Sequence, residues 1–158
     1  MLEEFSLGTF SESEKEALNC AWHRLDPWPD AVAGLERLKQ RYMIGTLSNG
    51  NIALIANMAK YARLPWDVIL GAEIARAYKP QPQAYLGSAA ALSLKPQQCM
   101  LVAAHNSDLE AALDCGFRTA FVERPFEHGP DQSTDLVASG NYDFIASDFV
   151  DLATQLKC

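Results

Sequence analysis

Residues 43–50 read Met-Ile-Gly-Thr-Leu-Ser-Asn-Gly, an apolar run that ends in a polar turn. A short apolar run bounded by a turn signal is typical of a buried β-strand. Residues 51–62 follow it with a helical pattern. The segment therefore predicts a strand, a turn and a helix in succession, which is the repeating unit of an α/β fold.

The same alternation of strand and helix continues from this unit to the C-terminus. Further strands are expected at 68–70, 100–104, 119–122 and 144–146, and helices at 80–92, 107–115 and from about 148. Upstream, helices are expected at 11–22, behind a capping box of Ser11 and Glu14, and at 30–41, capped by Asp30. Pro80 is expected in the first turn of its helix, and Gly116 as a left-handed helix stop. The pattern predicts a Rossmann-like parallel sheet with helices on both faces.

Composition narrows the classes of partner. The chain has 158 residues, the size of one domain, with a formal net charge of −7. Such a charge argues against nucleic acid and anionic membrane surfaces as partners, and no apolar run is long enough to span a membrane. The cysteines, Cys20, Cys99, Cys115 and Cys158, are widely spaced and are expected to be free thiols. A cytoplasmic location is the expectation.

Polar residues follow the expected strand ends, where a parallel α/β sheet binds its ligands. They are Ser48, Asn49, His105, Asn106 and Asp108, with Lys79 ahead of the helix at Pro80. Each has an ordinary alternative as a turn residue, a helix cap or a surface lysine. Together, a hydroxyl, N–H groups at a helix start and an ammonium suit an anionic substrate and a carboxylate that must stay ionised.

Three of these segments resemble known family motifs. Residues 47–50, 78–80 and 102–108 look like motifs two, three and four of the haloacid dehalogenase superfamily, most closely its type II branch, the L-2-haloacid dehalogenases. Residues 22–25 and 27–30 resemble the return from cap to core in such proteins. The resemblance implies a remnant of the helical cap and a connector over 1–26 and a core over 27–158.

The resemblance also implies chemistry. An aspartate attacks the carbon that bears the halogen of a small carboxylate, and water hydrolyses the resulting ester. Ser48 and Asn49 would hold the substrate, Lys79 would keep the attacking aspartate charged, and Asp108 would orient the hydrolytic machinery. Tyr85 would support the site, with plain helix packing beside Leu86 as an equal alternative. His105 becomes a candidate base or a space-filling residue, and Asn106 a candidate substrate contact.

Two departures from the family pattern stand out. Where the dehalogenases carry Ser-x-Asn-x-x-Asp in motif four, this chain has Ala103, His105 and Asp108. The magnesium-dependent phosphatases of the superfamily need further acidic ligands beside Asp108, which Ala104 and His105 do not supply. His23, His105 and His128 show no zinc-ligand spacing with the cysteines. The expectation is a site without a metal ion or cofactor.

The second departure concerns the nucleophile. No Asp-x-x-Gly-Thr motif precedes Ser48, and residues 7–10 contain only its Gly-Thr. The sequence is therefore expected to lack the first central strand and most of the cap. In the family's sheet that strand lies between the strands that end at 47 and 104. These two are expected to pair directly, to accept a strand from another chain or to be marginally stable, and direct pairing or instability is favoured.

Three functions stay open. The first is a hydrolase of small haloacids that needs an aspartate from elsewhere. The second is a non-catalytic remnant or interaction domain, with room for a homodimer through open strand edges. The third and least favoured is a magnesium phosphatase. Residues 123–142 are expected to form a long loop over the crevice or the surface.

Overall fold

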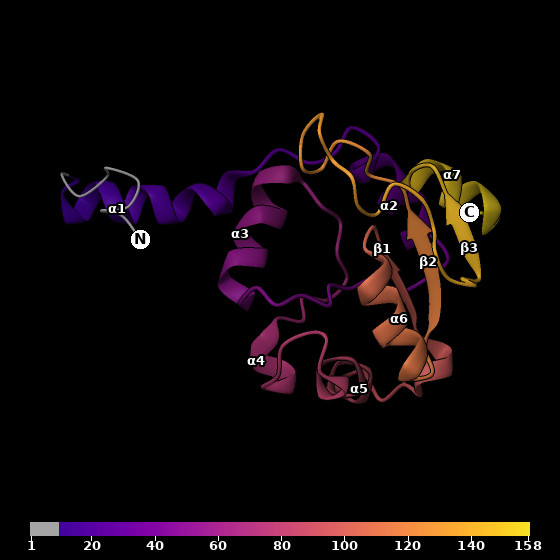
Figure 1. The fold of residues 1–158 in the computed structure, drawn as a ribbon. Coiled ribbons are helices and arrows are strands. Elements are labelled where there is room, and N and C mark those ends of the chain that lie inside the picture. The colour runs from indigo at the N-terminus through magenta and orange to yellow at the C-terminus, as the bar shows by residue number, and fades with distance from the viewer. Residues whose placement is uncertain (1–9) are drawn as a thin grey trace.

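The computed structural model describes residues 10–158 (Figure 1). The helices and strands, in chain order, are α1 (Glu12–Asn19), the 3-10 helix η1 (Cys20–Arg24), α2 (Ala31–Lys39), α3 (Ile52–Ala62), α4 (Ala72–Ala75), α5 (Pro82–Ala91), the 3-10 helix η2 (Pro96–Gln98), β1 (Met100–Ala103), α6 (Asn106–Asp114), β2 (Arg118–Val122), β3 (Phe144–Ala146) and α7 (Phe149–Gln155). The Gly-Thr pair at 8–9 lies outside the described residues.

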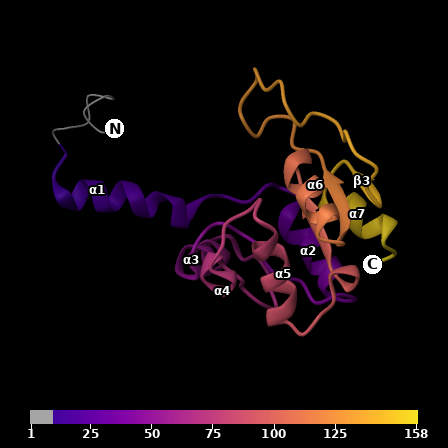
Figure 2. The same cartoon turned by 60° about the horizontal axis from the view of Figure 1, so that its bottom comes forward.

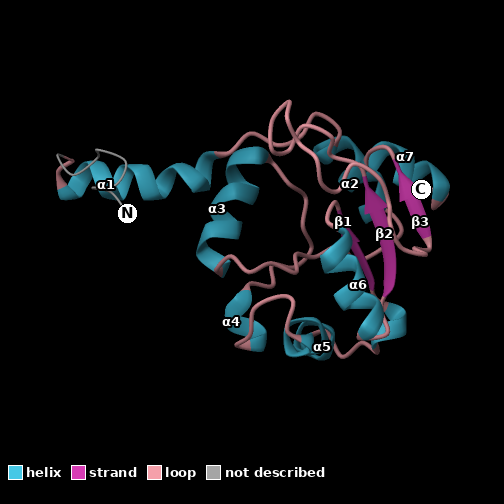
Figure 3. Ribbon diagram, viewed as in Figure 1, coloured by secondary structure: helices cyan, strands magenta, loops and turns pink. Residues whose placement is uncertain are grey.

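The sheet consists of β1, β2 and β3 in that order, and both strand pairs are parallel. Side chains of β2 alternate between two core clusters. Phe121 packs with residues of α5 and α6, whereas Ala120 and Val122 pack with residues of α2 and α7. Because successive side chains of a strand point to opposite faces, helices cover both faces of the sheet. Figure 3 shows α6 on one side of the strands and α7 on the other. The predicted α/β class is confirmed.

Local sequence signals fix several element ends as predicted. Ser11 and Glu14 form the capping box of α1, and Gly116 follows α6 with a left-handed φ of +81°. Asp148 accepts a hydrogen bond from the Asp151 N–H at 2.7 Å and begins α7. Gly34 serves close packing instead, because a Cβ at that position would lie 2.4 Å from Cβ of Phe149. This glycine allows α2 to approach the start of α7.

The strands expected at 43–47 and 68–70 are wrong as strands. Gly45 and Val68 form a single parallel bridge, supported by a hydrogen bond from the Asp67 N–H to the Ile44 carbonyl at 2.9 Å. Direct pairing between 43–47 and 100–104, one of the two favoured outcomes, is also wrong within residues 10–158, since β1 is an edge strand paired with β2 and Gly45 bridges to Val68 instead. The physical reason is that a pair of strands needs facing backbones about 4.8 Å apart. Residues 43–47 are instead positioned by residues 67–70, and β1 is positioned by β2.

Two predicted helix starts need correction. The helix expected to begin at Pro80 begins at Pro82, because the Gln81 N–H closes a turn onto the Tyr78 carbonyl at 2.9 Å. Asp30 precedes α2 but does not cap it, since its backbone is already helical at φ −84° and ψ −18°. A capping side chain requires an extended residue at that position. The short helix α4 was not expected.

The Asp30 carboxylate instead joins three elements. Its Oδ2 accepts hydrogen bonds of 2.8 Å from the Phe149 N–H, at the start of α7, and from Nη2 of Arg124, just after β2. Arg124 is buried, and its guanidinium lies over the rings of Trp28 and Phe149 at 5.0 Å and 5.4 Å. Burial opposes ionisation of Asp30, but the Phe149 and Arg124 hydrogen bonds outweigh it and lower the pKa of this carboxyl.

Helix α1 projects away from the remaining elements in both views of the ribbon (Figures 1 and 2), and it buries no residue. The following η1 packs on α3, where Nδ2 of Asn57 lies 2.7 Å from Nδ1 of His23. The boundary expected at residue 26 stays a prediction. Among residues 10–158, no helix has both the length and the apolar character needed to cross a membrane.

Candidate active site

An ion pair at the strand ends joins Lys79 to Asp108. Nζ of Lys79 donates a hydrogen bond to Oδ2 of Asp108, and the two side chains are 22% and 13% exposed. Asp108 lies in the first turn of α6, directly after β1, where the helix dipole favours a negative charge. Lys79 lies in the turn that the Gln81 N–H closes onto the Tyr78 carbonyl, and this turn brings its side chain beside Asp108. A half-buried ion pair therefore forms from two of the predicted site residues.

Tyr85 completes this cluster from α5. Its hydroxyl donates a 2.6 Å hydrogen bond to Oδ1 of Asp108, and its side chain is fully buried against Phe117 and other core residues. Burial, together with the hydrogen bond to the Asp108 carboxylate, raises the pKa of Tyr85 far above that of an ordinary phenol. The phenol therefore stays neutral and acts as a donor. Tyr85 packs in the core and also contacts the polar cluster, and its role in supporting a catalytic site stays a prediction.

Asn49 and Ser48 shape the turn before α3. Oδ1 of Asn49 accepts the Lys79 N–H at 2.6 Å, and Nδ2 of Asn49 donates to the Lys79 carbonyl at 3.2 Å. Oγ of Ser48 accepts the Gly50 N–H at 3.0 Å. Hence Asn49 fixes the main chain of the lysine that contacts Asp108. The hydroxyl proton of Ser48 and the second amide proton of Asn49 are left to donate elsewhere.

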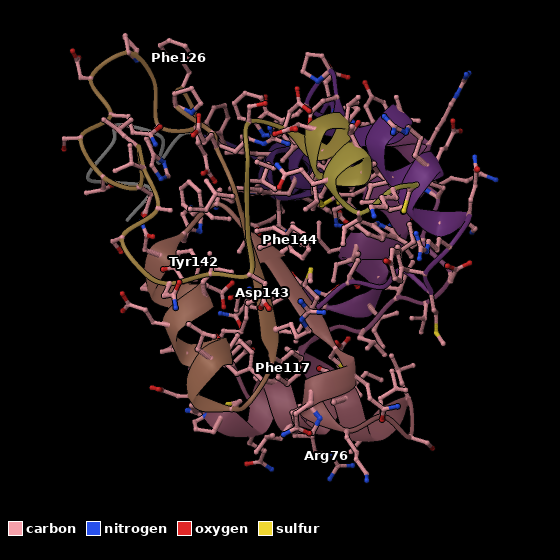
Figure 4. All side chains as sticks on the ribbon, turned by 90° about the vertical axis from the view of Figure 1, so that its right-hand side faces the viewer. Arg76, Phe117, Phe126, Tyr142, Asp143 and Phe144 are labelled. Atoms are coloured by element: carbon pink, nitrogen blue, oxygen red, sulfur yellow. The ribbon has the colours of Figure 1, made fainter. Side chains whose placement is uncertain are left out.

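Asn106 is directed at the loop over 123–142. Its Nδ2 donates to Oδ1 of Asp135 at 2.9 Å and to the Val137 carbonyl at 3.0 Å. Its Oδ1 accepts from the Ser139 N–H at 2.8 Å and from the Tyr142 hydroxyl at 3.0 Å. Figure 4 labels Tyr142 where the loop reaches β3. These four bonds use both donors and both lone pairs of the amide, so a substrate would have to replace one of the loop partners. The predicted substrate contact of Asn106 stays a prediction.

His105 also faces the loop. Its Nε2 lies 3.1 Å from Oε2 of Glu127, and its ring stacks on that of His128 with centroids 6.2 Å apart. Phe126 lies between β2 and Glu127 in the sequence, and its side chain is 67% exposed on the outer part of the loop (Figure 4). The structure thus separates the predicted residues into two groups. Asn49 and Asp108 bond to Lys79, Tyr85 bonds to Asp108, and Ser48 lies in the turn next to Asn49. His105 and Asn106 hold the loop.

A hollow of about 450 Å³ adjoins the first group. It is lined by residues of the α3 and α4 starts and by the turn before Lys79, including Asn49, Arg76 and Tyr78, but not by Lys79 or Asp108 themselves. Arg76 is exposed and was not expected from the sequence, since no motif marks it; its left-handed backbone at the end of α4 turns the chain at this point. Figure 4 shows it at the far end of the molecule from Phe126. The hollow carries charges of both signs, because Glu73 also lines it and accepts the Ile52 N–H at 3.0 Å.

Comparison with known proteins gives one consistent result. Residues 2–116 match the family model for haloacid dehalogenase-like hydrolases. The chain is 33% identical over 113 residues to (S)-2-haloacid dehalogenase 4A of Burkholderia cepacia, covering 70% of this chain and 49% of that enzyme. The chain therefore spans about half the length of this curated relative.

Solved structures agree. The defluorinating L-2-haloacid dehalogenase Rha0230 is 52% identical with a TM-score of 0.97, and the match covers 99% of this chain and 65% of that one. The L-2-haloacid dehalogenase PA0810 is 49% identical with a TM-score of 0.96, over 99% of this chain and 66% of that one.

Proposed function

The chain belongs to the haloacid dehalogenase-like hydrolases. On that premise we propose that it contributes Lys79 and the residues around it, but not the nucleophilic aspartate, to a hydrolytic site for small 2-haloacids. The observation that carries the proposal is the contact of Lys79 with Asp108, supported by Tyr85. An ammonium held by one carboxylate keeps two further protons for a second one. A lysine in this position lowers the pKa of an incoming aspartate, so that the aspartate stays ionised and can attack carbon.

The substrate carboxylate is proposed to bind at the turn that precedes α3. The Ser48 hydroxyl and the free amide proton of Asn49 are donors there, and Arg76 adds a positive charge at the adjoining hollow. His105 is a candidate base for the hydrolytic water, and Asp108 is proposed to orient that step. Two 2-haloacid dehalogenases among the relatives support this substrate class.

The nucleophile is proposed to come from outside the 158 residues. Within the printed sequence, no Asp-x-x-Gly-Thr follows an apolar run. The attacking carboxylate forms an ester bond to the substrate carbon, and the carbon–halogen bond breaks to release halide. Water then cleaves the ester, which regenerates the carboxylate and releases a hydroxy acid and a proton. We therefore expect the isolated 158-residue chain to be inactive.

The test compares the chain with an extended form. A segment that carries Asp-x-x-Gly-Thr after an apolar run is fused ahead of the chain, and chloride release from 2-chloropropionate is measured for both. The extended form is expected to release chloride, and the 158-residue chain to release none. Lys79→Ala should abolish release, whereas Lys60→Ala, an exposed lysine in α3, should leave it unchanged.

Other outcomes favour the alternatives. Chloride release by the 158-residue chain alone would contradict the proposed source of the nucleophile. A folded extended form without turnover would favour a non-catalytic interaction domain. Turnover of a general phosphate ester that depends on Mg²⁺ would favour the phosphatase. The proposal includes a cytoplasmic location, which the four free thiols support, and a homodimer as the assembly to be tested by light scattering.

A further inference from the structure

His105, Glu127 and His128 form a compact group at the carboxyl end of β1. Each offers one ligand atom, a ring nitrogen or a carboxylate oxygen, and these three atoms all lie within 4.8 Å of one another. His105 directly precedes α6, whereas Glu127 and His128 belong to the loop over 123–142. Residues more than 20 positions apart in sequence thus bring three potential metal ligands together.

Accessibility and geometry suit an ion that enters from solvent. The side chains of His105 and Glu127 are 42% and 32% exposed, and His128 is exposed as well. The two imidazole rings are nearly parallel, with an interplanar angle of 10°. The Nε2 of His105 is already 3.1 Å from the Glu127 carboxylate. In tetrahedral zinc sites, bonds of about 2.0–2.2 Å place neighbouring ligand atoms about 3.3 Å apart.

The chemical types decide which ion fits. Two imidazole nitrogens and one carboxylate oxygen match zinc sites in which three protein ligands leave a fourth position open. Imidazole also suits other first-row transition ions, whereas Mg²⁺ prefers a shell of oxygen ligands and waters. We propose that His105, Glu127 and His128 bind a divalent transition-metal ion, Zn²⁺ in particular.

The proposal departs from the expectation that the chain holds no metal ion. That expectation rested on the lack of acidic ligands beside Asp108 and on the spacing of histidines and cysteines, and none of the four cysteines belongs to this group. The site joins the first part of the loop to the end of β1, just as Asn106 joins its last part to α6. The proposal does not depend on dehalogenase activity, and it competes with the candidate role of His105 as a base, because a nitrogen that binds a metal ion cannot also accept a proton.

Calorimetric titration of the reduced 158-residue chain with ZnCl₂ tests the proposal. We expect a single equivalent to bind in the presence of excess Mg²⁺. His128→Ala and Glu127→Gln should each weaken binding by roughly 100-fold, the upper range seen even for the partners that support metal ligands. His23→Ala is the matched control, because His23 lies in η1 against Asn57, away from the group, and it should leave binding unchanged.

The Co²⁺ absorption spectrum identifies the ligands independently. A tetrahedral or five-coordinate spectrum without thiolate charge-transfer bands is expected, and it should disappear in His128→Ala. Thiolate bands, equal binding in wild type and both ligand variants, or a loss shared by His23→Ala would overturn the proposal. Circular dichroism should show that the ligand variants stay folded, since exposed substitutions typically change stability by less than about 0.5 kcal/mol.

Discussion

The side chain of Asn49 makes both of its hydrogen bonds with the main chain of Lys79, 30 residues later in the sequence. One bond runs from the Lys79 N–H to Oδ1, and the other from Nδ2 to the Lys79 carbonyl. The amide therefore holds the backbone of the lysine whose ammonium contacts Asp108. Two segments that resemble separate family motifs are joined in this way without a side-chain to side-chain contact.

Replacing this amide should loosen the lysine. Asn49→Ala is expected to lower the free energy of unfolding by about 1 kcal/mol, the usual net contribution of an intramolecular hydrogen bond. Urea denaturation followed by circular dichroism measures the change. Asn141→Ala, an exposed asparagine in the loop, is the control and should leave stability within experimental error. Equal effects of the two substitutions would show that the contact with Lys79 contributes nothing.

Removing the Tyr85 hydroxyl should lower the free energy of unfolding. Tyr85→Phe leaves Oδ1 of Asp108 without its phenol donor, and hydrogen bonds to charged groups contribute about 1.5–3 kcal/mol. The matched control is Tyr61→Phe, at a half-exposed tyrosine in α3, and it should cost far less. The comparison again uses urea denaturation.

This contribution has a defined pH dependence. The pKa of Tyr85 is raised in the folded state by burial and by the Asp108 hydrogen bond. The stabilisation is therefore fully present below the ordinary phenol pKa of about 10 and is lost as the pH rises above it. The difference in unfolding free energy between wild type and Tyr85→Phe should stay constant at neutral pH and shrink in alkali. A difference that grows in alkali would contradict this assignment.

Asp30→Asn should be the most damaging of these substitutions. It leaves the guanidinium of Arg124, whose side chain is 10% exposed, without its carboxylate, and breaking a buried ion pair costs about 3–5 kcal/mol. Asp143→Asn is the comparison, because its partner Arg118 is 53% exposed and solvent screens that pair. Its effect should stay below about 1 kcal/mol. Thermal or urea unfolding at pH 7 distinguishes the two.

Acid should remove the same contribution. The pKa of Asp30 is lowered in the folded state, because hydrogen bonds from Phe149 and Arg124 outweigh the opposing effect of burial. The stabilisation is thus present above the unfolded-state pKa of about 3.9 and is lost as the pH falls through the lower, folded value. Asp30→Asn should therefore be less sensitive to acid than wild type between pH 5 and pH 2, taken as roughly the range of this loss.

The unpaired edge of β1 should limit the stability of the 158-residue chain. Within residues 10–158, β1 has β2 as its strand partner, and segment 43–47 has a single bridge to Val68. Exposed backbone groups of this kind also favour association between chains. We expect a broad melting transition with a midpoint below about 45 °C, the low end for ordinary domains. A sharp, concentration-independent transition well above room temperature by circular dichroism would contradict this.

Local signals in the sequence were sufficient for the second half of the fold. The β3 strand and a closing helix from about residue 148 were predicted from the pattern of the sequence, and Gly116 from its place after a helix. The prediction of a strand at 43–47 was wrong because an apolar run indicates only that a segment is buried, whereas a strand also needs a hydrogen-bonded neighbour along its length. That neighbour cannot be read from the run itself.

The site shows the same limit. Strand ends and family motifs identified Lys79 and Asp108, which the structure brings into contact. The partners of His105 and Asn106 lie between 22 and 36 positions downstream, in a loop without periodic apolar residues. No local pattern could identify Glu127 or Asp135 as their partners, since these contacts arise only when the loop folds back over α6.

The four bonds of Asn106 have a consequence for how the loop opens. Partners at 135, 137, 139 and 142 all bond to one residue, since Asn106 also reaches Asp135 through its main-chain N–H and Tyr142 through its carbonyl, and the segment that carries them has no helix or strand of its own. Displacing Asn106 as a whole frees these bonds together, so residues 135–139 have no half-open arrangement, whereas Tyr142 keeps its packing on Phe121. In deuterated water, the Asn106 and Ser139 amide hydrogens should exchange at a common rate, as a single cooperative unit much smaller than the domain.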